Sequence, residues 1–514
     1  MEVMAGRRMN WKTGEIIAVS GLVIWGAWLR LYHLRETLIF QGDQGRDAMI
    51  AAEMLTQGNL TLIGPVTSVG NMYLGPFYYY FMVPFLALTY PDPIGPAYGV
   101  ALANIAALVV IYLMAKEMFS RTTALISLGL LTFTLPVVYL SRFSWNPNLA
   151  PLVGLLLVWS LYRFWVNLDY RQLLISGLLL SILSQLHYLA LIMLPVTVMV
   201  YGISFRQNPT ARGQLTRYGL IALVIYLLSW LPLIIFNSRH DQLILSGFEQ
   251  FLANRETHFV PQGSMVKTIQ EIEGKSYHLI ARTLGSLTPL TDRIIVWGGS
   301  FLLIGLLITH PLKGKPAKGL QLIGLTLGLT LAGIAIFTGD IFNHYLGYAY
   351  GAVILLWGWI LGRLWQITGW GGKVVTLVII VVIGFWSVPR LATWAAPAPS
   401  LNGVKAVAQD IAAQLPPGKF NLALLAESKD YKGMNYRYFL TTLKAVPASP
   451  EDYEQLNYLV VIDELGLTDP TAVSIYEIQH PGRLKLYNQF NSQFGPKIWL
   501  YQVEPATASA NLNL

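Results

Sequence analysis

Long apolar runs separated by short polar loops make up the chain from its N-terminus to about residue 390. Each run has about 20 mostly apolar residues, enough for a helix to cross a hydrocarbon core of about 30 Å. The pattern predicts eleven membrane-spanning helices, at 14–33, 96–115, 122–140, 149–166, 172–188, 189–205, 217–236, 293–309, 320–337, 345–362 and 373–389. We therefore expect a mainly α, polytopic membrane protein.

One further segment, 74–88, is apolar and aromatic, and the charges of the other loops decide how it is interpreted. If it does not span, the short basic loops 116–123, 162–172, 206–217, 311–319 and 363–373 all face the cytoplasm, as the positive-inside rule requires. If it spans, these loops face outward. We therefore expect 74–88 to lie in or dip into the outer interface, with an ordinary span as the alternative. Its tyrosines would then sit at headgroup depth, at Tyr73, Tyr78, Tyr79 and Tyr80.

The same topology places the N-terminus in the cytoplasm and three long segments outside, at 34–95, at 237–292 and after 389. The last segment changes composition: it has a helix-like run at 404–415 and strand-like runs at 420–426, 458–462 and 498–503. The sequence thus predicts a transmembrane domain at 1–389 and a small extracytoplasmic α/β domain at 390–514.

Composition agrees with a membrane location and excludes several kinds of chemistry. Of the 514 residues, 54% are hydrophobic and 12% charged, against about 25% charged in soluble domains. The net charge of +8 comes from basic residues scattered through short loops, which is not a nucleic-acid signature. The chain has no cysteine, so disulfides, thiol nucleophiles and cysteine-ligated metals are excluded.

The first outer loop carries the strongest candidate chemistry, in the stretch 40–47, which contains Asp43, Arg46 and Asp47. Ionisable groups at a membrane edge are costly unless they pair or act. A carboxylate here could deprotonate an acceptor hydroxyl or amine, or hold a metal. The alternative is a solvated loop whose acids cap the helix that follows.

A second outer loop, 141–148, contains Arg142 and Trp145. The planar guanidinium fork suits a phosphate, and an indole can stack on a sugar; an interfacial arginine reaching for water is the alternative. Two His-Tyr pairs, at 187–188 and at 344–345 after Thr338-Gly339-Asp340, also fall on the outer side. They lack metal-ligand spacing, and no nucleotide-binding or hydrolase motif occurs.

These residues resemble a known family. The pattern D-x-x-R-x-A-x-x-x-x-E-M-L from Asp43 to Leu55, followed by Gly75-Pro76 and a run of aromatics, is similar to the GT-C superfamily of membrane glycosyltransferases. It is most similar to glycosyltransferase family 39, which includes protein O-mannosyltransferases and aminoarabinose transferases. The resemblance covers the architecture of about the first 370 residues.

The resemblance implies a polyprenyl-phosphate sugar as donor and a first-loop aspartate that acts at the acceptor, here Asp43. Relatives often have Asp-Glu at this place, whereas this chain has Asp43-Gln44, which puts a paired-carboxylate reading in doubt. Arg46 matches the arginine of the family pattern, and Asp47 has no firm counterpart. Metal dependence is left open, and no metal ligands are assigned.

For the donor side, the resemblance implies that groups of the second outer loop bind the carrier phosphate. Arg142, with Trp145 beside it, is the candidate. His344 and Tyr345 occupy the place where relatives often have basic or aromatic contacts to that phosphate. The 237–292 segment could close over the site as a lid.

The sequence thus predicts transfer of a sugar from a lipid-linked phosphate to a protein, lipid or envelope glycan, at the outer face of the inner membrane. The bilayer, the donor and an unknown acceptor are the expected partners. One alternative is a transporter or flippase for lipid-linked sugars, which would show charges deep within broken helices. Another is a polysaccharide polymerase or ligase, with which the long 237–292 loop is compatible. Neither the sugar nor the acceptor is predicted.

Overall fold

The computed structural model describes residues 13–67, 72–253, 265–285, 288–337, 341–392, 399–493 and 495–504. Thr338-Gly339-Asp340, most of the Ala-Pro stretch before residue 399, and part of the expected lid lie outside these ranges. The chain divides into two compact units. Unit 1 comprises 1–32, 61–81 and 97–393, and unit 2 comprises 33–60, 82–96 and 394–514.

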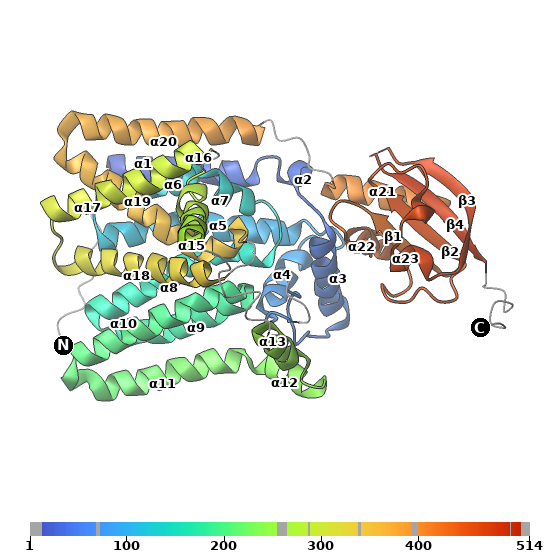
Figure 1. The fold of residues 1–514 in the computed structure, drawn as a ribbon, viewed down its shortest axis with the longest axis horizontal. Coiled ribbons are helices and arrows are strands. Elements are labelled where there is room, and N and C mark those ends of the chain that lie inside the picture. The colour runs from blue at the N-terminus through green and yellow to red at the C-terminus, as the bar shows by residue number, and fades with distance from the viewer. Residues whose placement is uncertain are drawn as a thin grey trace. The chain divides into compact units, whose positions relative to one another are not determined.

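Unit 1 is helical, and all eleven runs expected to span a membrane form helices within it. Figure 1 shows its long helices running alongside one another. Their bounds are α1 Thr13–Leu31, α5 Gly95–Met118, α6 Arg121–Phe133, α7 Leu135–Leu140, α8 Ala150–Asn167, α9 Tyr170–Leu186, α10 Met193–Gln207, α11 Arg212–Ser229, α12 Leu231–Arg239, α13 Leu243–Ala253, α15 Met265–Ser276, α16 Pro289–Arg293, α17 Gly299–Thr309, α18 Gly314–Ile336, α19 Gly347–Ile367 and α20 Gly369–Ala392. Short 3₁₀ turns stand before α8, α10, α11 and α19 at η1 Asn146–Leu149, η2 Tyr188–Ile192, η3 Pro209–Ala211 and η6 Asn343–Leu346, and π-helical turns at η4 Tyr277–Arg282 and η5 Ile294–Gly298.

Seven helices among the described residues are long and apolar enough to cross a membrane, or eight when one bent pair counts as a span. The bent pair is α11 with α12, turned by 43° at the break. The expected run 122–140 is divided at Thr134, ahead of Pro136, into α6 and α7. Proline there removes a helical hydrogen bond and cannot continue the helix undisturbed. The chain is a multi-pass membrane protein.

The segment 74–88 forms the single short helix α4, Phe77–Ala87, with Pro84 inside it. Its 11 residues rise about 16 Å at about 1.5 Å per residue, roughly half of the ~30 Å hydrocarbon core. The helix alone is shorter than the core is thick, and the interfacial placement of this segment stays a prediction drawn from loop charges.

Helix α19 is the most enclosed of the candidate spans, with 83% of its most apolar stretch buried inside the protein. It packs on α6, α8 and α20. Small residues permit the close approach: a Cβ added at Gly358 would lie 1.9 Å from Oγ of Ser127, and one at Gly154 would lie 2.2 Å from the carbonyl oxygen of Tyr348. Such small-residue contacts are how helices pack within a bilayer, where apolar burial gives little drive for association.

Unit 2 combines four strands with short helices. The helices are α2 Leu34–Thr37, α3 Gly42–Gln57, α21 Leu401–Gln414, α22 Met434–Thr442 and α23 Tyr476–Gln479, with a 3₁₀ turn η7 Pro470–Ala472; the strands are β1 Phe420–Leu425, β2 Tyr458–Asp463, β3 Arg483–Asn491 and β4 Lys497–Glu504. The sheet order is β1-β2-β4-β3. β1 and β2 run parallel, whereas β4 is antiparallel to both β2 and β3.

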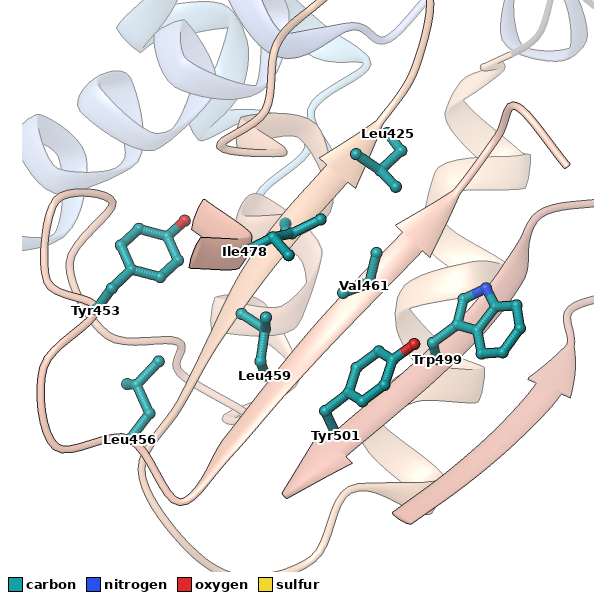
Figure 2. Close-up of a cluster of buried hydrophobic side chains, with 9 residues drawn as sticks. Leu425, Tyr453, Leu456, Leu459, Val461, Ile478, Trp499 and Tyr501 are labelled. Carbon is teal, nitrogen blue, oxygen red and sulfur yellow. The ribbon is translucent and has the colours of Figure 1, made fainter. Parts of the chain in front are cut away.

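A cluster of buried side chains covers one face of this sheet. It follows the two-residue period of the strands, with Ala423 and Leu425 from β1, Leu459 and Val461 from β2, and Trp499 and Tyr501 from β4; Tyr453, Leu456 and Ile478 complete it (Figure 2). The intervening residues of β1 and β2 are buried as well. Burial on both faces is typical of parallel strands, which have helices or loops against each side.

The small C-terminal α/β fold agrees with the sequence expectation, and β1, β2, β4 and α21 coincide with the predicted runs. β3 and α22 were not predicted. β3 is an edge strand with mostly exposed polar residues and a bulge between Leu486 and Asn488. α22 has only 9 residues with scattered aromatics, so neither gives a strong periodic signal. The predicted division at residue 389 stays a prediction, since unit 2 also includes 33–60 and 82–96.

Candidate functional site

The first candidate segment lies at the start of α3, whose N-terminus is closed by a capping box. The side chain of Gln41 accepts from the backbone of Gln44, and the backbone N–H of Gln41 donates to Oε1 of Gln44 at 3.0 Å. This reciprocal pair satisfies two of the N–H groups that a helix start leaves without partners. Gln44 is buried, so the residue that replaces the family's glutamate has a structural task here.

Arg46 joins the two acids of this segment. Its Nη1 donates to Oδ1 of Asp43 at 2.9 Å, and its Nη2 and Nε donate to Oδ1 of Asp47 at 2.8 and 3.1 Å. The Asp47 side chain is 1% exposed, whereas that of Asp43 is 47% exposed. Arg46 is thus anchored by a buried carboxylate and holds an accessible one. The structure brings together the three first-loop residues that the sequence singled out.

A third carboxylate, Asp430, lies against this segment from the far end of the chain. A Cβ added at Gly42 would lie 1.8 Å from its Oδ2, so Asp430 packs directly on the residue before Asp43. Burial raises the pKa of Asp430, and the negative charge of Asp43 raises it further, against a backbone hydrogen bond from Met434 and the charge of Arg46. Sequence reasoning missed Asp430, because nothing along the chain marks a contact across so many residues.

Helix α22 fixes the start of α3 through close backbone contact. A Cβ added at Gly45 would lie 2.4 Å from both N and Cα of Asn435. Asn435 is 1% exposed and donates from Nδ2 to the carbonyl of Phe40 at 3.2 Å. Phe40 in turn packs against Phe439 with ring centroids 5.4 Å apart. Gly42 and Gly45 were the only signals in the sequence that another segment approaches here.

In unit 1, Arg142 is buried and bound to backbone. Its Nη1 donates to the carbonyl of Leu29 at 2.6 Å and its Nη2 to the carbonyl of Tyr32 at 2.7 Å. These carbonyls end α1, and a cation at a helix C-terminus satisfies them and opposes the helix dipole. Burial lowers the pKa of Arg142 to about 10, so the side chain is still charged at neutral pH. The guanidinium of Arg142 was expected to face a phosphate. In the structure it donates these two hydrogen bonds to the end of α1.

Four aromatic rings from three separate segments form a continuous row in unit 1. The ring centroids of Trp145 and His344 are 4.2 Å apart, those of His344 and Tyr345 are 4.5 Å apart, and those of Tyr345 and His187 are 4.4 Å apart. The structure therefore brings together three candidates predicted from the sequence with one member of the other His-Tyr pair. We call these four residues the aromatic row.

Polar contacts hold the turns that carry the aromatic row. Asn146 donates from Nδ2 to the carbonyl of Leu186, the residue before His187, at 2.6 Å. Ser144, beside Trp145, shares a 2.6 Å hydrogen bond with the hydroxyl of Tyr78. The turns η1, η2 and η6 lie next to one another. Four of the segments expected on the outer side, those of Tyr78, Trp145, His187 and His344, thus meet at these contacts.

Among the residues described by the structure, no group of three histidine, aspartate or glutamate side chains is arranged to hold a metal ion. The groups that could do chemistry are an accessible carboxylate fixed by an arginine in unit 2 and, in unit 1, imidazole, indole and phenol groups with a buried arginine on the same loop as the indole.

Comparisons with known proteins agree with this architecture. Residues 74–234 match the family model described as dolichyl-phosphate-mannose-protein mannosyltransferase. ArnT from Cupriavidus metallidurans, solved bound to undecaprenyl phosphate, superposes with a TM-score of 0.60 at 12% identity, covering 95% of this chain and 98% of that one. The Archaeoglobus fulgidus oligosaccharyltransferase, solved with zinc and sulfate, gives a TM-score of 0.53 at 10% identity, covering 95% and 73%. A search of curated proteins by sequence found no match.

At these identities the structural likeness defines the fold. The chain has the polytopic fold of the GT-C membrane glycosyltransferases, as the resemblance of the first loop predicted. The family model covers the stretch from just before α4 into α12, most of which belongs to unit 1.

Proposed function

We propose that this protein is a membrane glycosyltransferase that moves a sugar from a polyprenyl-phosphate donor to an acceptor. The shared fold and the match to a mannosyltransferase family model support this class of reaction. The observation that carries the chemistry is the arrangement of Asp43 on Arg46. A half-exposed carboxylate, oriented by an arginine that is itself anchored on buried Asp47, is the arrangement that a general base needs.

In the proposed reaction, the acceptor hydroxyl oxygen forms a bond to the anomeric carbon of the donor sugar. The bond from that carbon to the phosphate oxygen breaks, and the phosphate leaves with the electron pair. Asp43 takes the proton of the acceptor hydroxyl. One displacement on one carbon inverts its configuration, as in inverting glycoside chemistry. Arg46 is a positioning residue, because its hydrogen bond fixes Oδ1 of Asp43.

The donor role rests on the residues of unit 1. His344 and Trp145 present an imidazole and an indole in contact, suited to a phosphate oxygen and a sugar face respectively. Tyr345 extends this surface. Arg142 contributes through its buried positive charge. In a surrounding of low dielectric constant, this charge stabilises the negative charge of the departing phosphate. Both of its Nη atoms donate to the end of α1, so its proposed role is electrostatic and not a bidentate grip on the phosphate.

We further propose the topology expected from loop charges: an inner-membrane protein with its N-terminus in the cytoplasm and residues 390–514 outside. Two observations support it. The loops that carry Trp145, His187 and His344 are all expected to lie outside, and they meet at the aromatic row. Helix α4 alone is shorter than the hydrocarbon core is thick, and only without a span there do all the short basic loops face the cytoplasm.

The reaction class is tested with full-length protein in lipid nanodiscs and a panel of synthetic polyprenyl-phosphate sugars, together with a crude membrane extract as acceptor. We expect release of free polyprenyl phosphate from one donor, and only in the presence of acceptor. If no donor is consumed while the same protein moves a lipid-linked sugar across liposomes, the transferase proposal is wrong and the protein is a transporter.

A further inference from the structure

Unit 2 contains a cavity of about 1230 Å³. It opens where the parallel strands β1 and β2 end, at Ala426 and Glu427 after β1 and at Glu464 after β2. Side chains and backbone groups beyond the carboxyl ends of neighbouring parallel strands converge on one place, which is where open α/β sheets bind their ligands. The cavity is larger than the ~300–1,000 Å³ typical of pockets for small ligands, so it has room for a sugar unit or two.

One wall of the cavity is a rigid loop after β2. The carboxylate of Asp463 accepts three backbone N–H groups, from Leu465 at 3.0 Å, Gly466 at 2.9 Å and Leu467 at 2.7 Å. Gly466 has a φ of 73°, a conformation that other residues rarely adopt. This wall is therefore formed before any ligand binds, and Asp463 is committed to shaping it.

Part of the cavity lining is the start of α3, through Gln41 and Gly42. Gly42 immediately precedes Asp43, so the Cα atom of the proposed base lies about 3.8 Å from a residue of the lining. Asp43 itself is not part of the lining, but it is the next residue along the chain from Gly42.

The polar groups of the lining favour a neutral or cationic ligand rich in hydroxyls. Glu464 accepts a hydrogen bond from Tyr436 at 2.6 Å on Oε1, which orients its carboxyl group. Glu427 is exposed in the same lining. The single lysine, Lys497, places its ammonium 3.6 Å from the centre of the Trp499 ring. Acids thus outnumber bases around the cavity, and their charge opposes the entry of an anion.

Buried hydrogen-bonding capacity points the same way. Asn435 lines the cavity, is 1% exposed, and its Oδ1 has no hydrogen-bond partner within the described part of the chain. Burial also raises the pKa of Glu464, against the hydrogen bond from Tyr436 and with the charge of Asp430. Sugar hydroxyls both donate and accept, and they match such a lining.

We propose that this cavity binds a carbohydrate portion of the acceptor and presents its hydroxyl to Asp43. The inference rests on the proposed transferase function and narrows the acceptor to a glycan or glycolipid. Glu464 and Glu427 are the specificity-determining residues, since each can accept hydrogen bonds from neighbouring hydroxyls. A hydroxyl-bearing peptide is the competing acceptor, and the experiment separates the two.

Binding is measured by saturation-transfer NMR on full-length protein in lipid nanodiscs, because maltoside detergents carry a competing sugar. The probes are mannose, glucosamine, N-acetylglucosamine and cellobiose, with glucose 6-phosphate as the anionic comparison and a serine- and threonine-rich peptide as the other class. The variants are Glu464→Gln and Glu427→Gln. Glu454→Gln is the matched control, since Glu454 is exposed in unit 2 and outside the cavity lining. The unfolding temperature of each variant shows that it is folded.

We expect at least one neutral or amino sugar to bind. Its dissociation constant should rise about tenfold in Glu464→Gln, the size of one lost hydrogen bond to a charged group, and stay unchanged in Glu454→Gln. Binding of no sugar, tighter binding of glucose 6-phosphate, or a peptide that binds and depends on Glu464 would each overturn the inference. The same measurement on Asp43→Asn should still show sugar binding. Sugar binding by a protein that consumes no donor would refute the transferase proposal while leaving the carbohydrate cavity in place.

Discussion

Arg46 donates a hydrogen bond of 2.9 Å from Nη1 to Oδ1 of Asp43 within the first turns of α3. Because Asp47 holds the other side of the same guanidinium, the direction of the Asp43 carboxylate depends on both partners. This relationship explains how one accessible acid can be kept in a fixed orientation in a segment that otherwise looks like an ordinary helix start.

We predict that Arg46→Gln lowers the turnover rate about tenfold or more, because a general base that loses its orientation loses much of its ~10²–10⁴-fold contribution. The KM for donor should change little. Lys432→Gln is the matched control, since Lys432 forms an exposed ion pair with Glu451 in the same unit. The rates are measured as initial velocities of sugar transfer. A variant that raises only the KM for donor would assign Arg46 to the phosphate instead.

Gly45→Ala should destabilise unit 2. The added methyl group would lie 2.4 Å from backbone atoms of Asn435, so one helix must shift, at a cost of about 1–3 kcal/mol as for other overpacked sites. Gly58→Ala is not a suitable comparison, because Gly58 has a φ of 73°. Gly274→Ala is suitable, since nothing lies within 4 Å of its added Cβ. Denaturant unfolding followed by the fluorescence of unit 2 tryptophans checks this; equal midpoints for the two variants would contradict the close contact.

Asp430 should make stability fall as pH rises. Its pKa in the folded protein is raised above the ordinary value of 3.8, so the folded state binds more protons than the unfolded state between these two values. The stabilising contribution is full below pH 3.8 and is lost as pH rises through the raised pKa. Unfolding temperatures from pH 3.5 to 7 should therefore drop less in Asp430→Asn than in wild type.

Asp469 should have the opposite effect on the pH dependence of stability. Hydrogen bonds from Thr471 lower its pKa, so its contribution is present above the ordinary value and is lost as pH falls. Asp469→Asn should change the acid side of the curve in the direction opposite to Asp430→Asn. Parallel curves for both variants would show that Asp430 is not held in the environment described.

His344→Gln should weaken binding of polyprenyl phosphate about tenfold, because a hydrogen bond to a charged phosphate is lost. The dissociation constant is measured with a short-chain polyprenyl phosphate on protein in nanodiscs. His310→Gln is the control, since His310 is a half-buried histidine at the end of α17 and not part of the aromatic row. Unchanged affinity in His344→Gln would remove the aromatic row from the donor site.

Much of the fold could be predicted from the sequence because its signals are local. Apolar runs of spanning length predict helices wherever they occur, and short apolar, β-branched or aromatic runs at β1, β2 and β4 predict strands. The count of spans was less predictable: Thr134 and Pro136 divide one run, and α11 and α12 meet at a bend. β3 was missed because it is a mostly exposed edge strand in which the alternation begun at Leu484 and Leu486 is interrupted by polar Asn488, at the bulge.

The candidate site was predictable only in part. Asp43, Arg46 and Asp47 lie within one helix turn of each other, so their association follows from the helix alone. The aromatic row joins residues from Trp145 to His344, and Asp430 reaches Gly42 from the other end of the chain. Contacts of this kind depend on tertiary packing, which leaves no spacing in the sequence. For Arg142, the residue type alone suggested phosphate binding, whereas its hydrogen bonds in the structure go to carbonyl groups at the end of α1.

The most direct test of the account is sugar transfer by Asp43→Asn compared with wild type, using the donor that wild type consumes. Asparagine keeps the size of the side chain and an oxygen that can accept from Arg46, but it cannot take the proton of an acceptor. The account predicts a folded variant that binds polyprenyl phosphate normally. Its rate of sugar transfer should be lower than that of wild type by about a hundredfold or more. Transfer at the wild-type rate would contradict the account and make Asp43 a structural residue of the α3 terminus.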